Sequence, residues 1–295
     1  MKQCIIGILA AIAAVPAFCE MRKNAPADPS PPRRVVIAYA SLAKLWHLAG
    51  GTAVGVPSLP AANALPEPMR GLPSTGTAAV PNAEAIAALR PDLVLLNGAS
   101  PRHRACGELL RGMGIEVLFA EYKNYHDFTR LLETFAVLNG KTTAELPEAE
   151  RVVADVRAVC ERAAALSPPR CAVIFAAASG FSLETPDTNT GGMVEMLGGR
   201  NLLKRSGSGR IHFSFEQLIL EDPDVILIVT MGDEAALKTK FEREFCAHPA
   251  WKDLRAARSG RVHFLAPELF LYMPGPEYPK AFRQLAALLY PEVQW

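Results

Sequence analysis

The sequence predicts an α/β fold with two Rossmann-like lobes of similar plan, connected by a single long α-helix, with a ligand crevice between the lobes. Three observations predict it: a motif that occurs once in each half, strand-like runs that alternate with helix-like stretches, and one long amphipathic segment between the halves. The chain has 295 residues, of which 50% are hydrophobic. At about 150 residues per domain, that length suits two lobes.

The repeated motif consists of a short helix, a proline stop and a strand. In both halves a glutamate stands seven residues before a Pro-Asp pair and an apolar run follows: Glu84 with Pro91-Asp92 and 93–96, and Glu216 with Pro223-Asp224 and 225–228. Proline cannot continue a helix, and an apolar run without alternation is typical of a strand buried on both faces.

The start of each half is also similar. Residues 35–39 correspond to 172–176, and both runs predict a strand. The helix that follows is capped by glycines in each case, at Gly50-Gly51 and Gly198-Gly199. Later in each half, further strands are expected at 117–120 and 262–265.

Residues 145–167 predict the connecting helix. One stripe of apolar side chains runs along it, Pro147 suits its first turn, and Pro168-Pro169 ends it. Its length would be about 20 residues, or about 30 Å. An ordinary surface helix inside one domain is the alternative. We therefore expect an N-terminal lobe at 34–144 and a C-terminal lobe at 168–295.

Residues 1–19 predict an export signal peptide, because Lys2 supplies a positive charge before the apolar run 5–15. The run is too short to span a bilayer, which takes about 20 apolar residues. We therefore expect an exported protein, either periplasmic or lipid-anchored on the outer face of the cytoplasmic membrane.

The residues around the expected cleavage site leave the mode of attachment open. Cys19 and the residues before it loosely resemble the lipidation site of bacterial lipoproteins, but Phe18 stands where a small residue is usual. Ordinary cleavage after Ala17 or Cys19 is the alternative. Residues 20–33, rich in proline and charge, predict a flexible spacer in either case.

Charge and cysteine usage exclude several classes of protein. Lys and Arg number 31 against 30 Asp and Glu, so the net charge is +1. The chain therefore has no excess of positive charge with which to bind the phosphates of a nucleic acid. The cysteines form no CxxC pair, which argues against a zinc ribbon or a redox centre. Cys160 and Cys171 are the nearest pair in the folded part, and both a disulfide and buried free thiols are consistent with them.

These motifs together resemble a known family, the substrate-binding proteins of ABC importers for iron-siderophores, haem and cobalamin. The resemblance covers residues 34–295 and rests on four stretches: 84–96, 190–201, 214–224 and 289–292. It implies a monomeric receptor without enzymatic activity or cofactor. The receptor would capture an iron or cobalt chelate and deliver it to an ABC permease and its ATPase subunit.

The ligand is expected at the loops that follow the strands, where open α/β sheets bind their ligands. These loops mix aromatic, amide and hydroxyl groups, although each position has a plain loop residue as its alternative. The candidate ligand-binding residues are Tyr39, Ser41, Asn97, Ser100, Tyr122, Ser179, Phe181, Met231, Phe270, Tyr272 and Met273. One Tyr, His or Met can hold haem iron axially, and Tyr272 is the first candidate, with Met273, Tyr39 and His47 behind it.

The resemblance also implies a docking role for two glutamates. In the family, one Glu on each lobe forms salt bridges with arginines of the permease, and Glu84 and Glu216 stand at the matching positions. A solvated surface glutamate is the alternative for each of them.

Other functions remain open. A receptor for a free metal ion or an oxyanion is less favoured, because the six histidines form no HxH or HExxH motif. A ligand sensor or surface adhesin without a transporter could use the same fold. An exported enzyme is the least favoured, since the sequence contains no GxSxG, GxxxxGK[ST] or GxGxxG motif.

Overall fold

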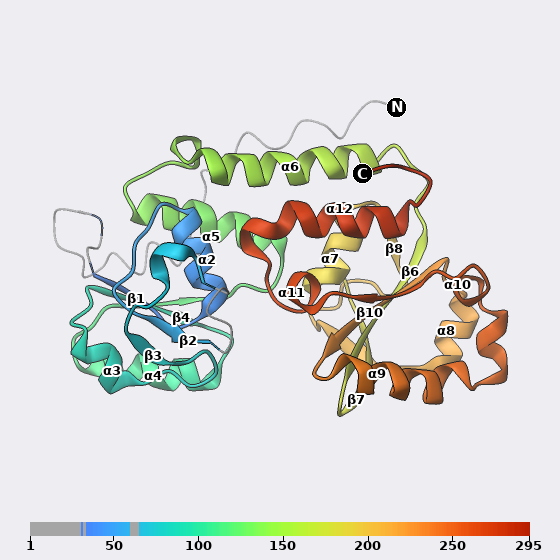
Figure 1. The fold of residues 1–295 in the computed structure, drawn as a ribbon, viewed down its shortest axis with the longest axis horizontal. Coiled ribbons are helices and arrows are strands. Elements are labelled where there is room, and N and C mark those ends of the chain that lie inside the picture. The colour runs from blue at the N-terminus through green and yellow to red at the C-terminus, as the bar shows by residue number, and fades with distance from the viewer. Residues whose placement is uncertain (1–30, 32–33, 60–64) are drawn as a thin grey trace. The chain divides into compact units, whose positions relative to one another are not determined.

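The computed structural model describes residue 31, residues 34–59 and residues 65–295. The expected signal peptide, Cys19 and nearly all of the expected spacer therefore lie outside the described residues. Figure 1 shows two β-sheets in separate lobes, with one helix, α6 (Pro147–Ala163), leading from the first lobe to the second. The predicted two-lobed α/β fold with a single connecting helix is confirmed.

The N-lobe sheet is parallel throughout. It consists of β1 (Val35–Ile37), β2 (Val56–Ser58), β3 (Ser74–Thr77), β4 (Leu93–Asn97) and β5 (Val117–Ala120). A parallel bridge between Val36 and Gly55 places β2 next to β1, which gives the order β3-β2-β1-β4-β5. The order reverses between β1 and β4, and ligands bind at such a reversal in open α/β sheets.

The C-lobe sheet repeats this order and adds two antiparallel strands. Its strands are β6 (Arg170–Ala177), β7 (Gly180–Glu184), β8 (Arg200–Asn201), β9 (Arg210–His212), β10 (Val225–Met231) and β11 (Val262–Leu265). The parallel order β8-β6-β10-β11 matches β2-β1-β4-β5 of the N lobe. The antiparallel strands β7 and β9 extend the sheet beside the last part of β6.

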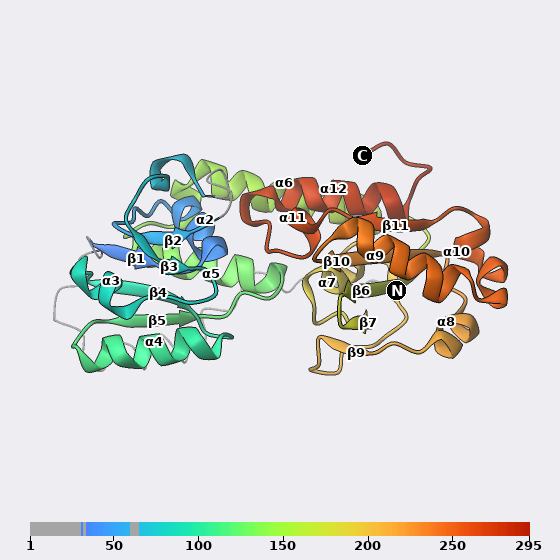
Figure 2. The same cartoon turned by 60° about the horizontal axis from the view of Figure 1, so that its bottom comes forward.

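The helices cover both faces of each sheet. They are α2 (Ala40–Leu48), α3 (Ala83–Ala88), α4 (Pro101–Gly112), α5 (Tyr125–Leu138), α6, α7 (Asn189–Met196), α8 (Phe215–Glu221), α9 (Glu234–Phe241), α10 (Arg255–Arg258), α11 (Pro267–Phe270) and α12 (Tyr278–Leu289). Single turns occur at η3 (Glu67–Met69), η4 (Thr143–Glu145), η5 (Glu242–Cys246), η6 (Pro249–Asp253) and η7 (Gly275–Glu277). In Figure 2, α4 lies on one side of the N-lobe sheet and α2 on the other.

The Pro-Asp motif forms the same hydrogen bonds in both lobes. Asp92 accepts a hydrogen bond from the backbone N–H of Arg34 at 2.9 Å, and Asp224 accepts one from Arg170 at 2.8 Å. The backbone N–H of each aspartate donates in return to the carbonyl of the same arginine. Each aspartate thus joins the start of the lobe's first strand to the start of the strand that follows the motif. The structure therefore explains why the motif recurs.

The Gly-Gly pairs end equivalent helices. Gly50 and Gly198 have φ values of 76° and 80°, in the left-handed region that glycine adopts without strain. The second glycine allows close packing: a Cβ atom on Gly51 would lie 2.2 Å from Trp46 Nε1. The predicted glycine caps are confirmed in both lobes.

One hydrophobic core extends through both lobes. It contains one face of the N-lobe sheet, the corresponding face of the C-lobe sheet, and buried side chains of α2, α5, α6, α7 and α12. Two smaller cores lie on the opposite faces, one in each lobe. Helices α6 and α12 run side by side over the shared core (Figure 1). The lobes are therefore not joined by the connecting helix alone.

Aromatic rings form the junction between the lobes. Tyr125 of α5 packs edge-on against Tyr278 and Phe282 of α12, with ring centroids 4.9 and 5.3 Å apart. Phe128 of α5 also contacts Tyr278, at 5.0 Å. All four side chains are buried, so a change in lobe orientation would have to break these contacts.

The connecting helix has 17 residues, which corresponds to about 25 Å. It begins at Pro147, and its buried side chains follow one helical stripe, as the sequence predicts. It ends at Ala163, before the expected end at 167. Among the described residues, no helix is long and apolar enough to cross a membrane.

The four cysteines of the described chain are free thiols, including Cys160 and Cys171. Cys171 lies inside the shared core, and burial raises its pKa to about 12. Burial likewise raises the pKa of Cys160 to about 12. Of the two alternatives left by the sequence, the structure shows the free thiols.

Candidate functional site

The candidate ligand-binding residues follow the carboxyl ends of strands in both lobes. In the N lobe, Tyr39 follows β1, Asn97 ends β4 and Tyr122 follows β5. In the C lobe, Ser179 lies in the turn after β6 and Met231 ends β10. Since the sheet order reverses between β1 and β4, and between β6 and β10, these positions are the ones at which such sheets bind ligands.

Tyr39 and Tyr272 come from different lobes and lie at this edge. Tyr39 is the N-cap residue of α2, and Tyr272 follows α11 in the C lobe. Burial raises the pKa of the Tyr39 phenol, and the neighbouring Tyr272 phenol raises it further. Tyr272 itself is 61% exposed, so its ring is accessible to a ligand. Two phenols from different lobes thus lie near one another, and one is available at the surface.

The buried His103 ring packs against the ring of Tyr39. Its ring meets the Tyr39 ring edge-on with centroids 6.0 Å apart, and its side chain is fully buried. Nδ1 accepts a hydrogen bond from the Asn97 backbone N–H at 3.3 Å, and Nε2 donates to the Ala78 carbonyl at 3.0 Å, which defines a neutral tautomer. Burial lowers the His103 pKa, in agreement with that state. The sequence analysis did not assign this role to His103.

Asn97, Ser100 and Ser41 lie at this edge with different surroundings. The Asn97 side chain accepts a hydrogen bond from Ala99, and the Ser100 hydroxyl caps α4 by accepting one from the His103 backbone. Both side chains therefore shape the loop between β4 and α4. Ser41 lies in the first turn of α2 and is partly exposed.

In the C lobe, the structure separates exposed candidates from packed ones. Ser179 is exposed and Met231 is 49% exposed. Phe181, by contrast, packs edge-on against Phe245 at 4.6 Å in the core on the other face of the sheet. Phe270 is 2% exposed, and its carbonyl accepts a hydrogen bond from Thr190. Ser179 and Met231 are thus free for a ligand, whereas the aromatic pair has packing partners.

Tyr122 and Met273 lie at the junction of the lobes. Tyr122 is 8% exposed, and burial raises its pKa far above the usual range. Met273 is partly buried, and its sulfur lies 3.9 Å from the Tyr278 hydroxyl oxygen. The Tyr278 hydroxyl donates its proton to Asn189 Oδ1 at 2.9 Å. Neither Tyr278 nor Asn189 carries a motif by which the sequence could identify it.

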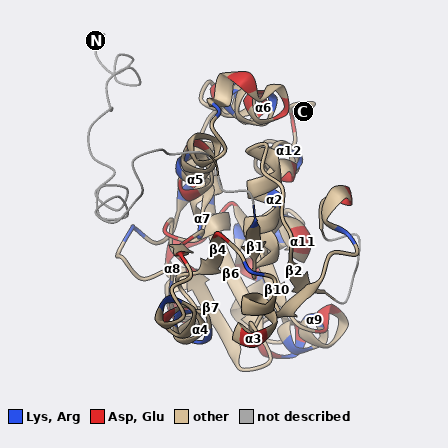
Figure 3. Cartoon of the chain, turned by 90° about the vertical axis from the view of Figure 1, so that its left-hand side faces the viewer, with Lys and Arg blue, Asp and Glu red and all other residues tan. Residues whose placement is uncertain are grey.

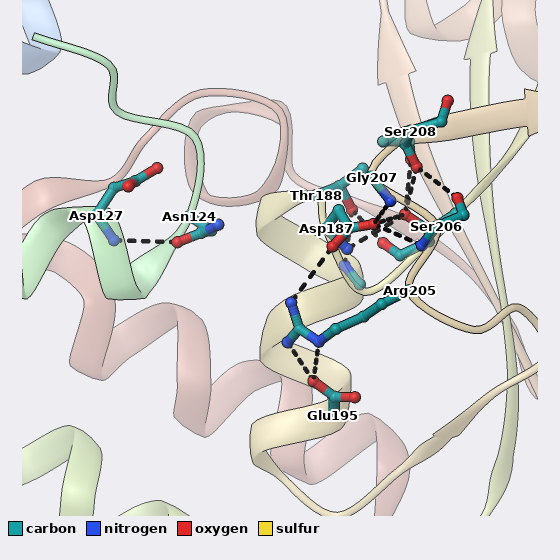
Figure 4. A network of polar contacts seen from close by, with 12 residues as sticks. Asn124, Asp127, Asp187, Thr188, Glu195, Arg205, Ser206, Gly207 and Ser208 are labelled. Atoms are coloured by element: carbon teal, nitrogen blue, oxygen red, sulfur yellow. Dashed lines mark hydrogen bonds and ion pairs between the residues drawn. The ribbon is translucent and has the colours of Figure 1, made fainter.

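A polar network fixes the segment before α7. The Asp187 carboxylate accepts hydrogen bonds from the backbone N–H groups of Ser206 and Gly207, each at 3.0 Å. The Ser206 bond is the main reason that the Asp187 pKa is lowered. Arg205 reaches both Asp187 and Glu195, as Figure 4 shows. The turn at 205–208 is therefore held against α7 rather than free.

Glu84 and Glu216 occupy the same position in equivalent short helices. Each is the second residue of its helix, after the N-caps Asn82 and Ser214, whose side chains accept hydrogen bonds from the third residue at 3.0 and 3.1 Å. Both glutamates are exposed. The pKa of Glu216 is lowered by hydrogen bonds from its own backbone N–H and from the Ser214 hydroxyl.

His47 lies away from the tyrosine pair. It stands eight residues after Tyr39 along α2, about 12 Å farther on. Its neighbours line a separate hollow of about 500 Å³ that includes Lys44, Glu148 and Glu277. The structure therefore does not bring His47 together with Tyr39 and Tyr272.

Charged residues lie mainly on the helices, and the strands contain few of them (Figure 3). Within the described ranges, no three His, Cys, Asp or Glu side chains are arranged to hold a metal ion. Tyr39 and Tyr272 at the lobe edge are accordingly the candidate site, because they come from different lobes and the exposed Tyr272 has a group able to bind iron.

Comparisons with known proteins agree with this fold. A structure from Listeria monocytogenes, described as an ABC transporter substrate-binding protein, superimposes with a TM-score of 0.77 at 21% identity and covers 89% of this chain and 99% of its own. The Fe(3+)-citrate-binding protein YfmC of Bacillus subtilis is 26% identical over 79% of this chain and 72% of its own. The high-affinity heme uptake system protein IsdE of Staphylococcus aureus is 26% identical over 77% of each chain.

The family comparison covers most of the chain. The family described as periplasmic binding protein matches residues 35–269, from the start of β1 into α11. This range includes the N lobe, the connecting helix and every strand of the C-lobe sheet, so it agrees with the resemblance found in the sequence. The chain belongs to the periplasmic binding protein family.

Proposed function

We propose that this protein is an extracytoplasmic receptor that captures a metal chelate and delivers it to an ABC importer. The chelate would be a ferric siderophore, haem or cobalamin. The family assignment supports a binding protein. Relatives described as binding ferric citrate and as taking up haem support a chelate as the cargo. The protein would work as a monomer beside a permease and its ATPase subunit, periplasmic or lipid-anchored.

The single observation that carries the ligand proposal is the exposed Tyr272 phenol on one lobe, close enough to Tyr39 on the other lobe to raise the Tyr39 pKa. Phenolate oxygen is a known ligand of haem iron, and the exposed Tyr272 is the group that would bind a ferric centre. Asn97 and Ser100 hold the neighbouring loop, while Ser179 and Met231 supply exposed groups from the other lobe. The site would take a partly apolar ligand that contacts both lobes.

Substitution of the two tyrosines tests this site. We expect Tyr272→Phe to remove an iron-phenolate absorbance band and to weaken binding of haemin or ferric citrate at least tenfold, because the ring stays and only the oxygen is lost. Tyr39→Phe should weaken binding less, since Tyr39 is more buried. Tyr290→Phe is the matched control, because the Tyr290 hydroxyl is buried and donates to Leu197. Unchanged spectra and affinity in Tyr272→Phe would refute the assignment.

We further propose that Glu84 and Glu216 dock on the permease. Their support is the equivalent helix position, the exposure of both side chains and their placement one on each lobe. Two carboxylates of this kind would complement two positively charged sites on a permease with two similar subunits.

Charge reversal tests the docking proposal. The double variant Glu84→Lys, Glu216→Lys should abolish chelate uptake into cells while the affinity of the isolated protein stays unchanged. Glu148→Lys is the control, because Glu148 is also an exposed glutamate at the second position of a helix. Normal uptake in the double variant would refute docking, and lost affinity would place these glutamates in the ligand site.

A further inference from the structure

A hollow of about 390 Å³ lies on the C lobe, and arginines form most of its lining. Asp224 directly precedes β10 and Arg261 directly precedes β11, so the hollow lies at the amino ends of two parallel strands. Met231 marks the carboxyl end of β10, where the candidate ligand site lies, and β10 spans about 20 Å. The hollow is therefore separate from that site. Its lining residues are Asp224, Arg255, Arg258, Ser259 and Arg261.

Arg255 holds two carboxylates beside the hollow. Its Nε lies 2.8 Å from Asp222 Oδ2, and its Nη1 lies 2.6 Å from Asp224 Oδ1. The second oxygen of each carboxylate accepts a hydrogen bond from a backbone N–H at 2.8 Å. All four carboxylate oxygens thus have donors. The three arginines of the lining outnumber these two carboxylates, so the positive charge is in excess.

Arg258 supplies a charge without an ion pair. Its side chain is exposed and forms no hydrogen bond or ion pair within the described ranges. It nevertheless lies near the carboxylates. Partial burial raises the pKa of Asp222, but the hydrogen bonds and charge of Arg255, together with the charge of Arg258, lower this pKa overall. Arg258 is therefore an unpaired cation beside the ion pairs of Arg255.

Arg261 supplies a guanidinium that is fixed in place. Its Nη2 donates to the carbonyls of Leu288 and Leu289 at 3.0 and 2.8 Å, where α12 ends. Its Nε is buried and has no acceptor among the residues that the structure describes. Native proteins pair the great majority of such donors, because a buried donor without an acceptor costs free energy. In a residue that lines an arginine-rich hollow, the unused donor indicates an anionic acceptor.

We propose that this hollow binds a phosphate group through Arg258 and Arg261. A guanidinium presents its N–H donors in a planar fork that matches the oxygens of a phosphate, and hydrogen bonds between charged groups are stronger than neutral ones. A phosphate also has enough oxygens for two guanidinium groups to share. Inorganic phosphate and the headgroup of phosphatidic acid both offer this chemistry. The site is independent of the proposed capture of a chelate, because it lies at the opposite ends of the strands.

Arg258→Gln tests the site, since the Arg258 side chain holds no described residue in place and its loss should not change the fold. Isothermal titration calorimetry with sodium phosphate at low ionic strength measures binding, because salt screens exposed charges. Sodium chloride at the same ionic strength is the blank. We expect saturable phosphate binding that Arg258→Gln weakens about fivefold or more.

Arg102→Gln is the matched control. Arg102 is also an exposed arginine on a helix, and its side chain forms no hydrogen bond or ion pair in the described part of the chain. We expect this variant to bind phosphate as the parent protein does. Absence of phosphate binding by the parent, unchanged affinity in Arg258→Gln, or equal losses in the two variants would each overturn the proposal.

Arg261→Lys tests the second arginine. The substitution keeps the positive charge at the end of α12 but removes the Nε donor and the planar fork, so phosphate binding should weaken about threefold or more. Circular dichroism verifies that the variant is folded at the temperature of the titration. Affinity equal to that of the parent would overturn the role of Arg261.

Vesicles distinguish the two sources of phosphate. Sedimentation with phosphatidylcholine vesicles that contain phosphatidic acid is compared with sedimentation with pure phosphatidylcholine vesicles. Binding that requires phosphatidic acid and is lost in Arg258→Gln would identify a lipid headgroup, whereas binding of inorganic phosphate alone would identify a soluble phosphate. Binding of neither would overturn the proposal. If the parent protein binds no chelate, the proposed function fails, but these measurements still decide the phosphate site.

Discussion

The shared core predicts that the two lobes unfold as one unit, and Phe128→Ala tests this. Phe128 lies on α5 in the N lobe, is fully buried, and contacts Tyr278 of the C lobe with ring centroids 5.0 Å apart. Its ring also lies 5.6 Å from Tyr125 and 6.3 Å from Tyr122. Removing the ring therefore opens a cavity where the lobes meet.

The magnitude follows from these contacts. Truncation of a buried phenylalanine to alanine costs about 3 to 5 kcal/mol of the free energy of unfolding. Aromatic pairs add about 0.5 to 1.5 kcal/mol beyond the area they bury, and Phe128 takes part in three such pairs. We therefore expect a loss in the upper part of that range, about 4 to 5 kcal/mol.

Two tryptophans report the lobes separately. Trp46 lies on α2 in the N lobe, and Trp251 lies in η6 in the C lobe. Two variants are made, one that keeps only Trp46 and one that keeps only Trp251, with the other tryptophans replaced by phenylalanine. Urea unfolding followed by fluorescence should give the same transition in both variants. Phe128→Ala should lower both midpoints by the same amount. Transitions that separate, or a midpoint that falls only for Trp46, would refute the single unit.

Three further predictions follow from other contacts. Arg210→Met should cost about 3 to 5 kcal/mol at pH 8, because Glu184, only 2% exposed, would keep a buried charge without its partner. Burial raises the Glu184 pKa in the folded chain, so lowering the pH protonates this carboxyl and removes the unpaired charge. Urea unfolding should therefore show that Arg210→Met lowers the free energy of unfolding less at pH 5 than at pH 8. Equal decreases at the two pH values would contradict this. Gly51→Ala should cost about 1 to 3 kcal/mol by thermal unfolding, since its Cβ would lie 2.2 Å from Trp46 Nε1, and an unchanged melting temperature would contradict the packing. Small-angle scattering with and without haemin should show little change in radius of gyration, because the aromatic junction resists lobe motion; a large contraction would show that it opens.

The repeat and the connecting helix could be predicted because their signals are local. Proline ends a helix wherever it occurs, and a continuous apolar run needs burial on both faces. The structure shows a further feature that the two copies of the motif have in common. The residues directly before the Pro-Asp pairs, Arg90 and Asp222, have a strained backbone with positive φ values of 46° and 39°. The antiparallel strands β7 and β9 were not predicted, since Phe181 and its neighbours acquire a strand pattern only by pairing with β6.

The site could be predicted only in part. The strand ends are visible in the sequence, and they place Tyr39 and Met231 at one edge of their sheets. The direction of each side chain depends on tertiary packing, which turns Phe181 toward the other face of its sheet. The roles of His103 and Asn189 depend on contacts with residues far along the chain, so no local pattern reveals them.

Titration of the purified protein with haemin, ferric citrate and cobalamin tests the central claim most directly. Binding would be followed by absorbance and by quenching of tryptophan fluorescence. We predict saturable binding of at least one of these chelates, with an affinity that Tyr272→Phe weakens and Tyr290→Phe leaves unchanged. Absence of binding to all three chelates and to a panel of ferric siderophores would contradict the claim that this protein is a chelate receptor.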